Sequence, residues 1–260
     1  MRVAVVQSDI VWEDPQSNYV ALRPWLSAAA AADARLVVLP EMFATGFSMR
    51  TERTAERAGG PTTAFLRDSA RQHGFWLAGS VALRSDEDGR PRNSLLLAGP
   101  EGELHRYDKI HASAFGGEQD HFGCGRTFTT VDVEGVRVTL FVCYDLRFAD
   151  EFWATAESTD CYLVVASWPT TRLAHWTTLL TARAIENQAY VVGSNRVGVG
   201  GGDDFSGGSM VVGPWGEILA TAHGGPTMLL ADVDPQQVRE LRQRLPVLAE
   251  RRYPAPQVAP

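Results

Sequence analysis

The sequence predicts an α/β fold in which two β-sheets pack face to face, with helices on the outside. Segments typical of buried strands alternate with helix-like segments along the whole chain, and short hairpins are inserted between them. A single doubly wound sheet is the alternative that this pattern leaves open. A chain of 260 residues can bury one large core, and no composition shift marks a linker. We therefore expect one domain over residues 1–260.

In the first half of the chain, apolar runs of strand length predict strands at residues 2–7, 35–39, 75–83, 94–98 and 103–107. The last two flank Gly99-Pro100-Glu101-Gly102, a turn sequence that predicts a hairpin. An alanine-rich composition predicts a helix over 17–34, which Pro24 must kink or begin. Pro61 suits a first helical turn, so a second helix is expected over 61–73. The charged residues 85–92 and the Gly-, His- and Phe-rich residues 110–125 are expected to form loops.

In the second half, the same criterion predicts strands at residues 128–133, 136–142, 161–166, 190–195, 209–212, 217–221 and 228–233. The intervening sequences Glu134-Gly135 and Gly213-Pro214-Trp215-Gly216 predict hairpins. Helices are expected over 147–156, 174–188 and 235–244, the last of them capped by Asp234. Residues 198–208 are rich in Gly and Asp but lack a phosphate-binding glycine pattern, so we expect a loop there.

Composition excludes several classes of protein. A net charge of −7 argues against a nucleic-acid partner and against an anionic membrane surface. No apolar run approaches transmembrane length, and the first strand follows Met1 directly, which leaves no room for a signal peptide. The three cysteines, Cys124, Cys143 and Cys161, do not form a disulfide framework. We therefore expect the reducing cytoplasm as the compartment.

Cys143 is the first candidate for chemistry. It directly follows the buried strand 136–142 and precedes a helix-like stretch, so its thiol is expected on a sharp strand-to-helix turn. The helix N-terminus favours a thiolate there, and the Tyr144 N–H is placed to meet an oxyanion. The alternative is a free cysteine that serves only as a core residue.

Glu41 and Lys109 are the candidate partners of Cys143. Each follows a predicted strand, and Lys109 is the single lysine among 24 basic residues, the rest being arginine. Arginine serves on a surface as well as lysine does, so a retained lysine indicates a need for a compact ammonium. A carboxylate can take the thiol proton, and an ammonium can stabilise a tetrahedral oxyanion, as amide hydrolysis requires. The alternatives are a solvated loop acid and a leftover lysine.

Other hydrolytic and redox chemistries have weaker support. The G-x-S-x-G motif of serine hydrolases is absent, and Cys161 lies in an apolar run, unlike the exposed resolving cysteine of a thiol peroxidase. A zinc site would use known ligand spacings, which are not found among His105, His111, His121 and Cys124. A papain-like enzyme needs a downstream histidine base, but nothing local supports that role for His175 or His223.

Three motifs resemble those of the nitrilase superfamily of carbon–nitrogen hydrolases, in the family's chain order. Leu39-Pro40-Glu41 is similar to its general-base motif, Tyr107-Asp108-Lys109-Ile110-His111 to its lysine motif, and Cys143-Tyr144-Asp145-Leu146-Arg147-Phe148 to its nucleophile motif. Ala112-Ser113 departs from the Leu-Phe pair that is frequent in the family. Ala182 to Gln188 is similar to its long-helix signature, and Glu118 matches the second glutamate that positions the lysine. The resemblance implies an α-β-β-α sandwich, no metal or organic cofactor, and a homodimer to which the tail, residues 245–260, contributes.

Within this superfamily, further segments resemble the bacterial omega-amidases, which hydrolyse the terminal amide of 2-oxoglutaramate or 2-oxosuccinamate. These segments are Ser167-Trp168-Pro169, Arg172, His175-Trp176 and Asn195-Arg196-Val197-Gly198. Such a small-molecule amide carries a carboxylate, for which Arg172 is the candidate partner, unless it is a surface arginine. Trp168 and Phe43 are candidates for the pocket wall. The alternatives are an N-carbamoyl amidohydrolase, an aliphatic amidase, or a catalytically silent interaction protein.

Overall fold

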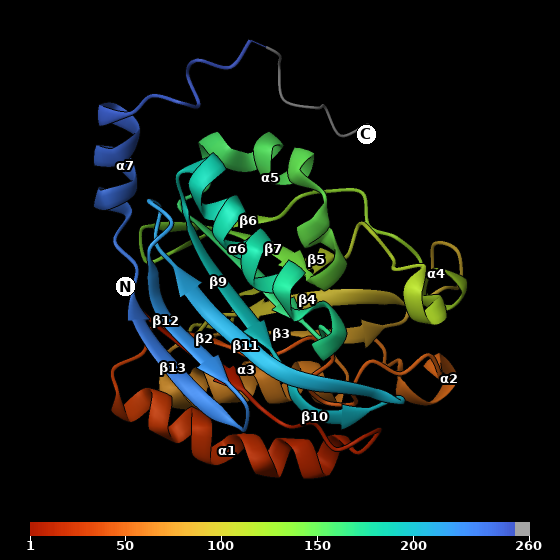
Figure 1. Cartoon of the computed structure of the whole chain (residues 1–260). Coiled ribbons are helices and arrows are strands. Elements are labelled where there is room, and N and C mark those ends of the chain that lie inside the picture. Colours follow the sequence, from red (N-terminus) through yellow and green to blue (C-terminus); the bar gives the residue numbers. More distant parts are fainter. Residues whose placement is uncertain (253–260) are drawn as a thin grey trace.

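A computed structural model describes residues 1–252, apart from the side chain of Phe115, as two mixed β-sheets packed face to face between helices (Figure 1). The predicted sandwich is thereby confirmed, and the single doubly wound sheet is wrong. The strands are β1 (Arg2–Gln7), β2 (Leu36–Val38), β3 (Trp76–Leu83), β4 (Arg92–Ala98), β5 (Leu104–Asp108), β6 (Thr130–Val133), β7 (Val136–Val142), β8 (Cys161–Ala166), β9 (Tyr190–Asn195), β10 (Val197–Gly200), β11 (Asp203–Val212), β12 (Ile218–His223) and β13 (Thr227–Asp232). The α-helices are α1 (Pro15–Ala31), α2 (Thr51–Thr54), α3 (Pro61–His73), α4 (Glu118–His121), α5 (Ala149–Thr155), α6 (Leu173–Asn187) and α7 (Pro235–Arg244).

The first sheet has the strand order β13-β1-β2-β3-β4-β5, with β1, β2 and β3 parallel. Successive residues of its strands point to different layers. Val3 and Val5 enter the core between the sheets, whereas Ala4 and Val6 pack beneath α1 and α3. Because both faces are covered, β1 is apolar at every position from residue 3 to 6, and for this reason the sequence predicts it so clearly.

The second sheet has the order β10-β11-β9-β8-β7-β6, and β12 pairs with β11. Its central strands β7, β8 and β9 are parallel, and α5 and α6 lie over its outer face (Figure 1). The carboxyl ends of parallel strands open at one edge of a sheet, where α/β proteins place their ligands. Cys143 directly follows β7 at that edge.

The helix ends mostly agree with the sequence prediction. The Asp234 side chain caps α7 by accepting from the Gln236 N–H at 2.9 Å. Helix α1 begins earlier than expected, because Asp14 caps it and Pro15 occupies its first turn, so Pro24 lies in its interior. Among the residues that the structure describes, no helix is both long and apolar enough to cross a membrane.

Two predicted loops contain regular structure. Residues 198–208, expected as a loop, belong to an antiparallel hairpin of β10 and β11 in which Val197 pairs with Ser206 and Val199 with Asp204. Its turn is made by Gly201 and Gly202, both at positive φ. The loop prediction was wrong because glycine lowers strand propensity locally, whereas pairing with β9 and β12 supplies the missing stabilisation. Residues 110–125 likewise include the short helix α4.

Candidate active site

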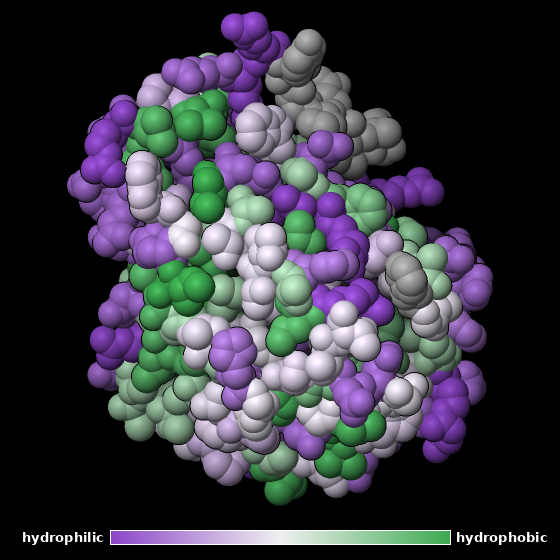
Figure 2. Space-filling view, viewed as in Figure 1, coloured by the Kyte–Doolittle hydropathy of each residue, from purple (hydrophilic) through white to green (hydrophobic). Residues whose placement is uncertain are grey.

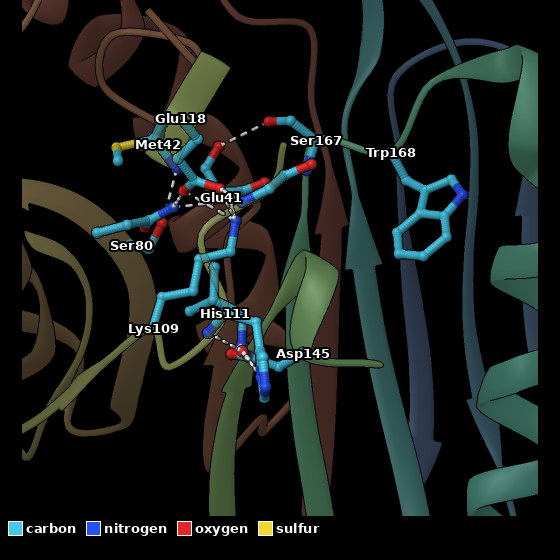
Figure 3. Close-up of polar contacts among 12 residues, drawn as sticks. Glu41, Met42, Ser80, Lys109, His111, Glu118, Asp145, Ser167 and Trp168 are labelled. Carbon is cyan, nitrogen blue, oxygen red and sulfur yellow. Dashed lines mark hydrogen bonds and ion pairs between the residues drawn. The ribbon is translucent and has the colours of Figure 1, made fainter. Parts of the chain in front are cut away.

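Glu41 lies just beyond β2 and is completely buried. Its Oε1 accepts hydrogen bonds from Asn93 Nδ2 at 2.7 Å and from Lys109 Nζ at 3.2 Å. Its Oε2 accepts from the backbone N–H of Ser167 at 2.7 Å, at the end of β8 (Figure 3). Donors from both sheets therefore fix the plane of this carboxylate.

Lys109 directly follows β5, and its side chain reaches toward Glu41 and Glu118 (Figure 3). Its Nζ donates to both oxygens of Glu118, at 2.9 and 2.7 Å, and only 2% of the side chain is exposed. Burial by itself lowers the pKa of Lys109, but the charges of Glu118 and Glu41 outweigh it, so the pKa is raised and the ammonium is retained.

Glu118 opens helix α4 and is also completely buried. Besides Lys109, its carboxylate accepts from the Ser113 N–H at 2.6 Å and from Asn93 Nδ2 at 3.2 Å. Burial raises the pKa of Glu118; the Lys109 charge opposes the shift and the Glu41 charge adds to it. Two buried carboxylates thus share one buried ammonium.

Cys143 occupies the turn after β7 with φ of +46°, a left-handed conformation that is uncommon for a residue with a side chain. The thiol lies on the predicted turn between a strand and a helix, but a 3₁₀ segment, Cys143–Arg147, separates it from α5, which begins at Ala149. Burial and the Glu41 carboxylate raise the pKa of Cys143 well above its usual value, and Lys109 only partly opposes them. This shift opposes the predicted preference for a thiolate, so attack by the sulfur requires a base that removes the thiol proton.

A cavity of about 510 Å³ opens above the sulfur. Its wall includes Cys143, Lys109, Tyr144, Ser167 and Trp168, together with Trp12, Phe47, Ser48, Met49, Arg50, Ser113, Gly116, Arg147, Pro169, Arg172, Gly200, Gly201, Asp203 and Phe205. The predicted wall residue Phe43 is not in this lining. It is buried beside Phe65, with ring centroids 6.1 Å apart, and Phe47 of the same loop takes the expected place.

Three arginines line this cavity: the predicted Arg172, and Arg147 and Arg50, which the sequence analysis did not single out. The Arg147 guanidinium lies 4.7 Å from the centre of the Trp168 ring and 5.6 Å from that of Tyr144. Arg50 is held by Glu13, whose carboxylate accepts from its Nε at 2.7 Å. The cavity wall is thus cationic in a protein with a net charge of −7.

Asn93 is a second site residue that the sequence analysis did not identify. It is buried, and its amide nitrogen donates to both Glu41 and Glu118. The available signal was the polar pair Asn93-Ser94 before the apolar stretch of β4, where a buried amide needs a partner.

The candidate zinc ligands are not gathered into one site. Within the described residues, potential ligand atoms of His111, Asp145 and Glu151 lie within 4.8 Å of one another. His105, His121 and Cys124 do not belong to this group; the His105 ring stacks on Trp76 instead. His111 contacts the two carboxylates as an ion pair, with Nδ1 at 3.4 Å from Asp145 and 3.3 Å from Glu151.

The fold and the site are those of a hydrolase with a cysteine at its centre, and comparison with known proteins identifies the family. The sequence profile of the family described as carbon–nitrogen hydrolase matches residues 2–243. The chain belongs to this family. The solved structure of XC1258 from Xanthomonas campestris, a CN-hydrolase superfamily protein with an arsenic adduct in the active site, is 35% identical, with a TM-score of 0.92 and 97% of each chain covered.

Among curated relatives, the omega-amidase YafV of Escherichia coli strain K12 is 38% identical over 249 residues, which cover 95% of this chain and 94% of that protein. The 2-oxoglutaramate amidase of Bacillus subtilis strain 168 is 31% identical, over 94% of this chain and 95% of its own length. The resemblance seen in the motifs therefore extends over nearly the whole chain.

Proposed function

We propose that this protein hydrolyses the terminal amide of a 2-oxo-dicarboxylate monoamide, such as 2-oxoglutaramate or 2-oxosuccinamate, and releases ammonia. One observation carries the proposal: the buried Glu41–Lys109–Glu118 cluster lies beside Cys143 beneath a cavity lined by arginines. The similarity to YafV and to the B. subtilis amidase supports this substrate class.

In the first half-reaction, Glu41 accepts the thiol proton as the Cys143 sulfur bonds to the amide carbon. The raised pKa of the thiol makes such a base necessary. The carbonyl electrons move to oxygen, and Lys109 Nζ and the Tyr144 N–H stabilise the oxyanion. The C–N bond then breaks, the nitrogen takes the proton from Glu41 and leaves as ammonia, and a thioester remains.

In the second half-reaction, Glu41 takes a proton from water as the water oxygen bonds to the thioester carbon. The tetrahedral oxyanion forms again beside Lys109, and collapse breaks the C–S bond. The sulfur regains its proton from Glu41, and the acid product leaves. Glu118 positions Lys109 throughout, because both of its oxygens accept from the ammonium.

The substrate carboxylate is proposed to bind Arg172 on the cavity wall, with Trp168 beside it. A charge-assisted hydrogen bond contributes roughly 1.5–3 kcal/mol to binding. Arg172→Ala should therefore raise KM for the acid substrate about tenfold to a hundredfold and leave kcat less affected. Exposed Arg23→Lys on α1 is the control and should change neither value.

Ammonia release from a panel of amides tests the function directly. Activity should be highest on 2-oxo-dicarboxylate monoamides and should fall on neutral aliphatic amides and N-carbamoyl amino acids. Equal rates on charged and neutral amides would replace this proposal with an aliphatic amidase. No ammonia from any amide, with the protein folded, would indicate an interaction protein instead.

We also propose that the chain acts as one domain in the cytoplasm and forms a homodimer. Exposed apolar side chains support the dimer: Ile185 of α6 is 54% exposed, Trp215 is 61% and Leu245 is 42%. Figure 2 shows hydrophobic side chains among polar ones over α6, α7 and β12. Of the predicted tail, residues 253–260 lie outside the described residues. Trp215→Glu should yield monomers in sedimentation, whereas Val20→Glu on α1 should not; a dimer unchanged by Trp215→Glu contradicts this surface.

A further inference from the structure

Asp145 ties the chain segment that carries Lys109 to the segment that carries Cys143. It is completely buried, and its Oδ2 accepts from the Tyr107 hydroxyl at 2.9 Å and from the Val142 N–H at 3.1 Å. Its Oδ1 accepts from the His111 N–H at 2.9 Å. Tyr107 and His111 stand on either side of Lys109 in the chain, and Val142 immediately precedes Cys143. One carboxylate therefore sets the lysine segment against the nucleophile turn.

The turn that Asp145 holds is strained. Cys143 has φ of +46°, and a residue with a Cβ stays in this conformation only where its surroundings fix it. The hydrogen bond from the Val142 N–H to Asp145 is such a constraint, since it fixes the residue directly before the strained one. Loosening Asp145 would let the sulfur move relative to Lys109 and Glu41.

The His111 ring is the cation beside this carboxylate. Its Nδ1 lies 3.4 Å from Asp145 and 3.3 Å from Glu151 of α5, and the ring stacks on Phe148 with centroids 3.5 Å apart. Figure 3 shows His111 beside Asp145, apart from the Glu41 and Glu118 carboxylates that Lys109 reaches. Without a cation, two largely buried carboxylates would face each other here.

The charges around the ring favour its protonated form. Asp145 faces it from the nucleophile turn and Glu151 from α5, with Asp150 adding negative charge beside Glu151. Burial alone lowers the pKa of His111, but the contacts and charges of Asp145 and Glu151 outweigh it and raise the pKa to about 9. From β5, Tyr107 stays a neutral donor, because burial raises its pKa well above the usual value.

We propose that His111 is a positioning residue: its imidazolium pairs with Asp145 and Glu151 and so keeps the Cys143 turn aligned with Lys109. This inference rests on the proposed function, in which Cys143 and Lys109 serve one reaction. Its consequence is an alkaline limit on the rate. As the ring loses its proton, the carboxylates lose their cation, the strained turn relaxes, and kcat falls while KM changes little.

The test compares native protein with His111→Gln and Glu151→Gln from about pH 6 to 10. Native kcat should fall above about pH 9. His111→Gln should be roughly tenfold slower at neutral pH, without that alkaline fall, because a small misalignment suffices. Glu151→Gln should keep the neutral rate and move the fall to lower pH, because one of two carboxylates is removed. His105→Gln, on the preceding strand β5, is the matched control and should match the native profile.

A second readout needs no amide substrate. The rate of Cys143 alkylation by iodoacetamide, measured with Cys124→Ser in every variant, should be greater in native protein than in His111→Gln at neutral pH. The two rates should converge above about pH 9. A constant ratio across this range overturns the inference even if no amide is hydrolysed. An unchanged alkaline limit in Glu151→Gln overturns it even if His111→Gln fails to fold. Changed alkylation without amide hydrolysis retains the inference and rejects only the proposed function.

Discussion

Replacing Lys109 by arginine tests whether this site needs an ammonium or only a positive charge. The Lys109 Nζ lies 2.7–3.2 Å from three carboxylate oxygens of Glu41 and Glu118, and 5.3 Å from the centre of the Phe47 ring. Arginine keeps the charge but is larger and planar, and it does not give up a proton. With 2% of the lysine side chain exposed, the larger group can extend only toward the cavity in which the substrate is proposed to bind.

The expected loss can be estimated from these contacts. The guanidinium must displace either a carboxylate or the substrate carbonyl, which amounts to removing one oxyanion donor. That costs on the order of 10²–10³ in kcat. Overpacking the buried contacts around Lys109 costs about 1–3 kcal/mol, which for a chain of this length lowers Tm by roughly 2–10 °C. Lys109→Arg should therefore be folded at 25 °C but slower by at least a hundredfold, with KM nearly unchanged.

Steady-state ammonia release gives kcat and KM, and calorimetry gives Tm. Arg23→Lys, an exposed exchange on α1, is the control and should alter none of them. A Lys109→Arg protein with a kcat within about threefold of the native value would show that positive charge alone suffices. It would remove the ammonium geometry from the mechanism proposed above.

Three further results are expected. Iodoacetamide should inactivate the enzyme in step with labelling of Cys143, whereas labelling of exposed Cys124 should leave activity intact. Buried Cys161 should stay unlabelled, because burial raises its pKa. Full inactivation with Cys143 unmodified contradicts this prediction. Asn93→Asp places a third carboxylate beside Glu41 and Glu118, so chemical denaturation should show a loss of about 3 kcal/mol or more, and a stability equal to the native value contradicts this. Because the pKa of His111 rises from 6.5 to about 9 on folding, its stabilising contribution is complete below pH 6.5 and is lost as pH rises through about 9. After a discount for its partial exposure, the free energy of unfolding should fall by about 2 kcal/mol over that range, and His111→Gln should lack this fall.

The sequence predicts strands well where both faces of a strand are buried, and poorly where tertiary contacts decide. Segments such as β1 are apolar at successive positions, so the strand can be predicted without knowing which of its faces is buried. The β10–β11 hairpin differs because glycine is required there by close approach. A Cβ on Gly207 would lie 2.4 Å from the Gln7 side chain, and one on Gly208 would lie 2.6 Å from Leu173 Cδ1. Both residues also have positive φ. From local propensity alone, these glycines indicate a loop. The reason why glycine is needed at these positions is the close approach of segments that are distant in the sequence.

For the site, the positions of residues at strand ends predicted which of them lie close together. They did not predict the orientation of side chains in the loops. Glu41, Lys109 and Cys143 each follow a strand, so topology alone brings them together. Phe43 and Phe47 lie in one irregular loop, which has no helical or strand periodicity. The sequence therefore does not reveal which of the two rings faces the cavity. In the structure, Phe43 packs where glycine at position 79 makes room, since a Cβ there would lie 2.6 Å from its ring. That pairing links β3 to the loop after β2 and has no local signature.

The raised pKa of Cys143 shows how burial and neighbouring carboxylates outweigh a local electrostatic rule. A turn near a helix N-terminus favours a thiolate, but that effect is small and falls off within one turn. Here Glu41, Glu118 and Lys109 already leave one net negative charge in a buried cluster, so a thiolate would add a second one. In the mechanism proposed above, moving the thiol proton to Glu41 during attack avoids this, because the negative charge passes from the carboxylate to an oxyanion beside Lys109. The buried site then carries one net negative charge before and after attack. The proposed mechanism therefore requires Glu41 and Lys109 together, and we expect neither residue alone to make this thiol reactive.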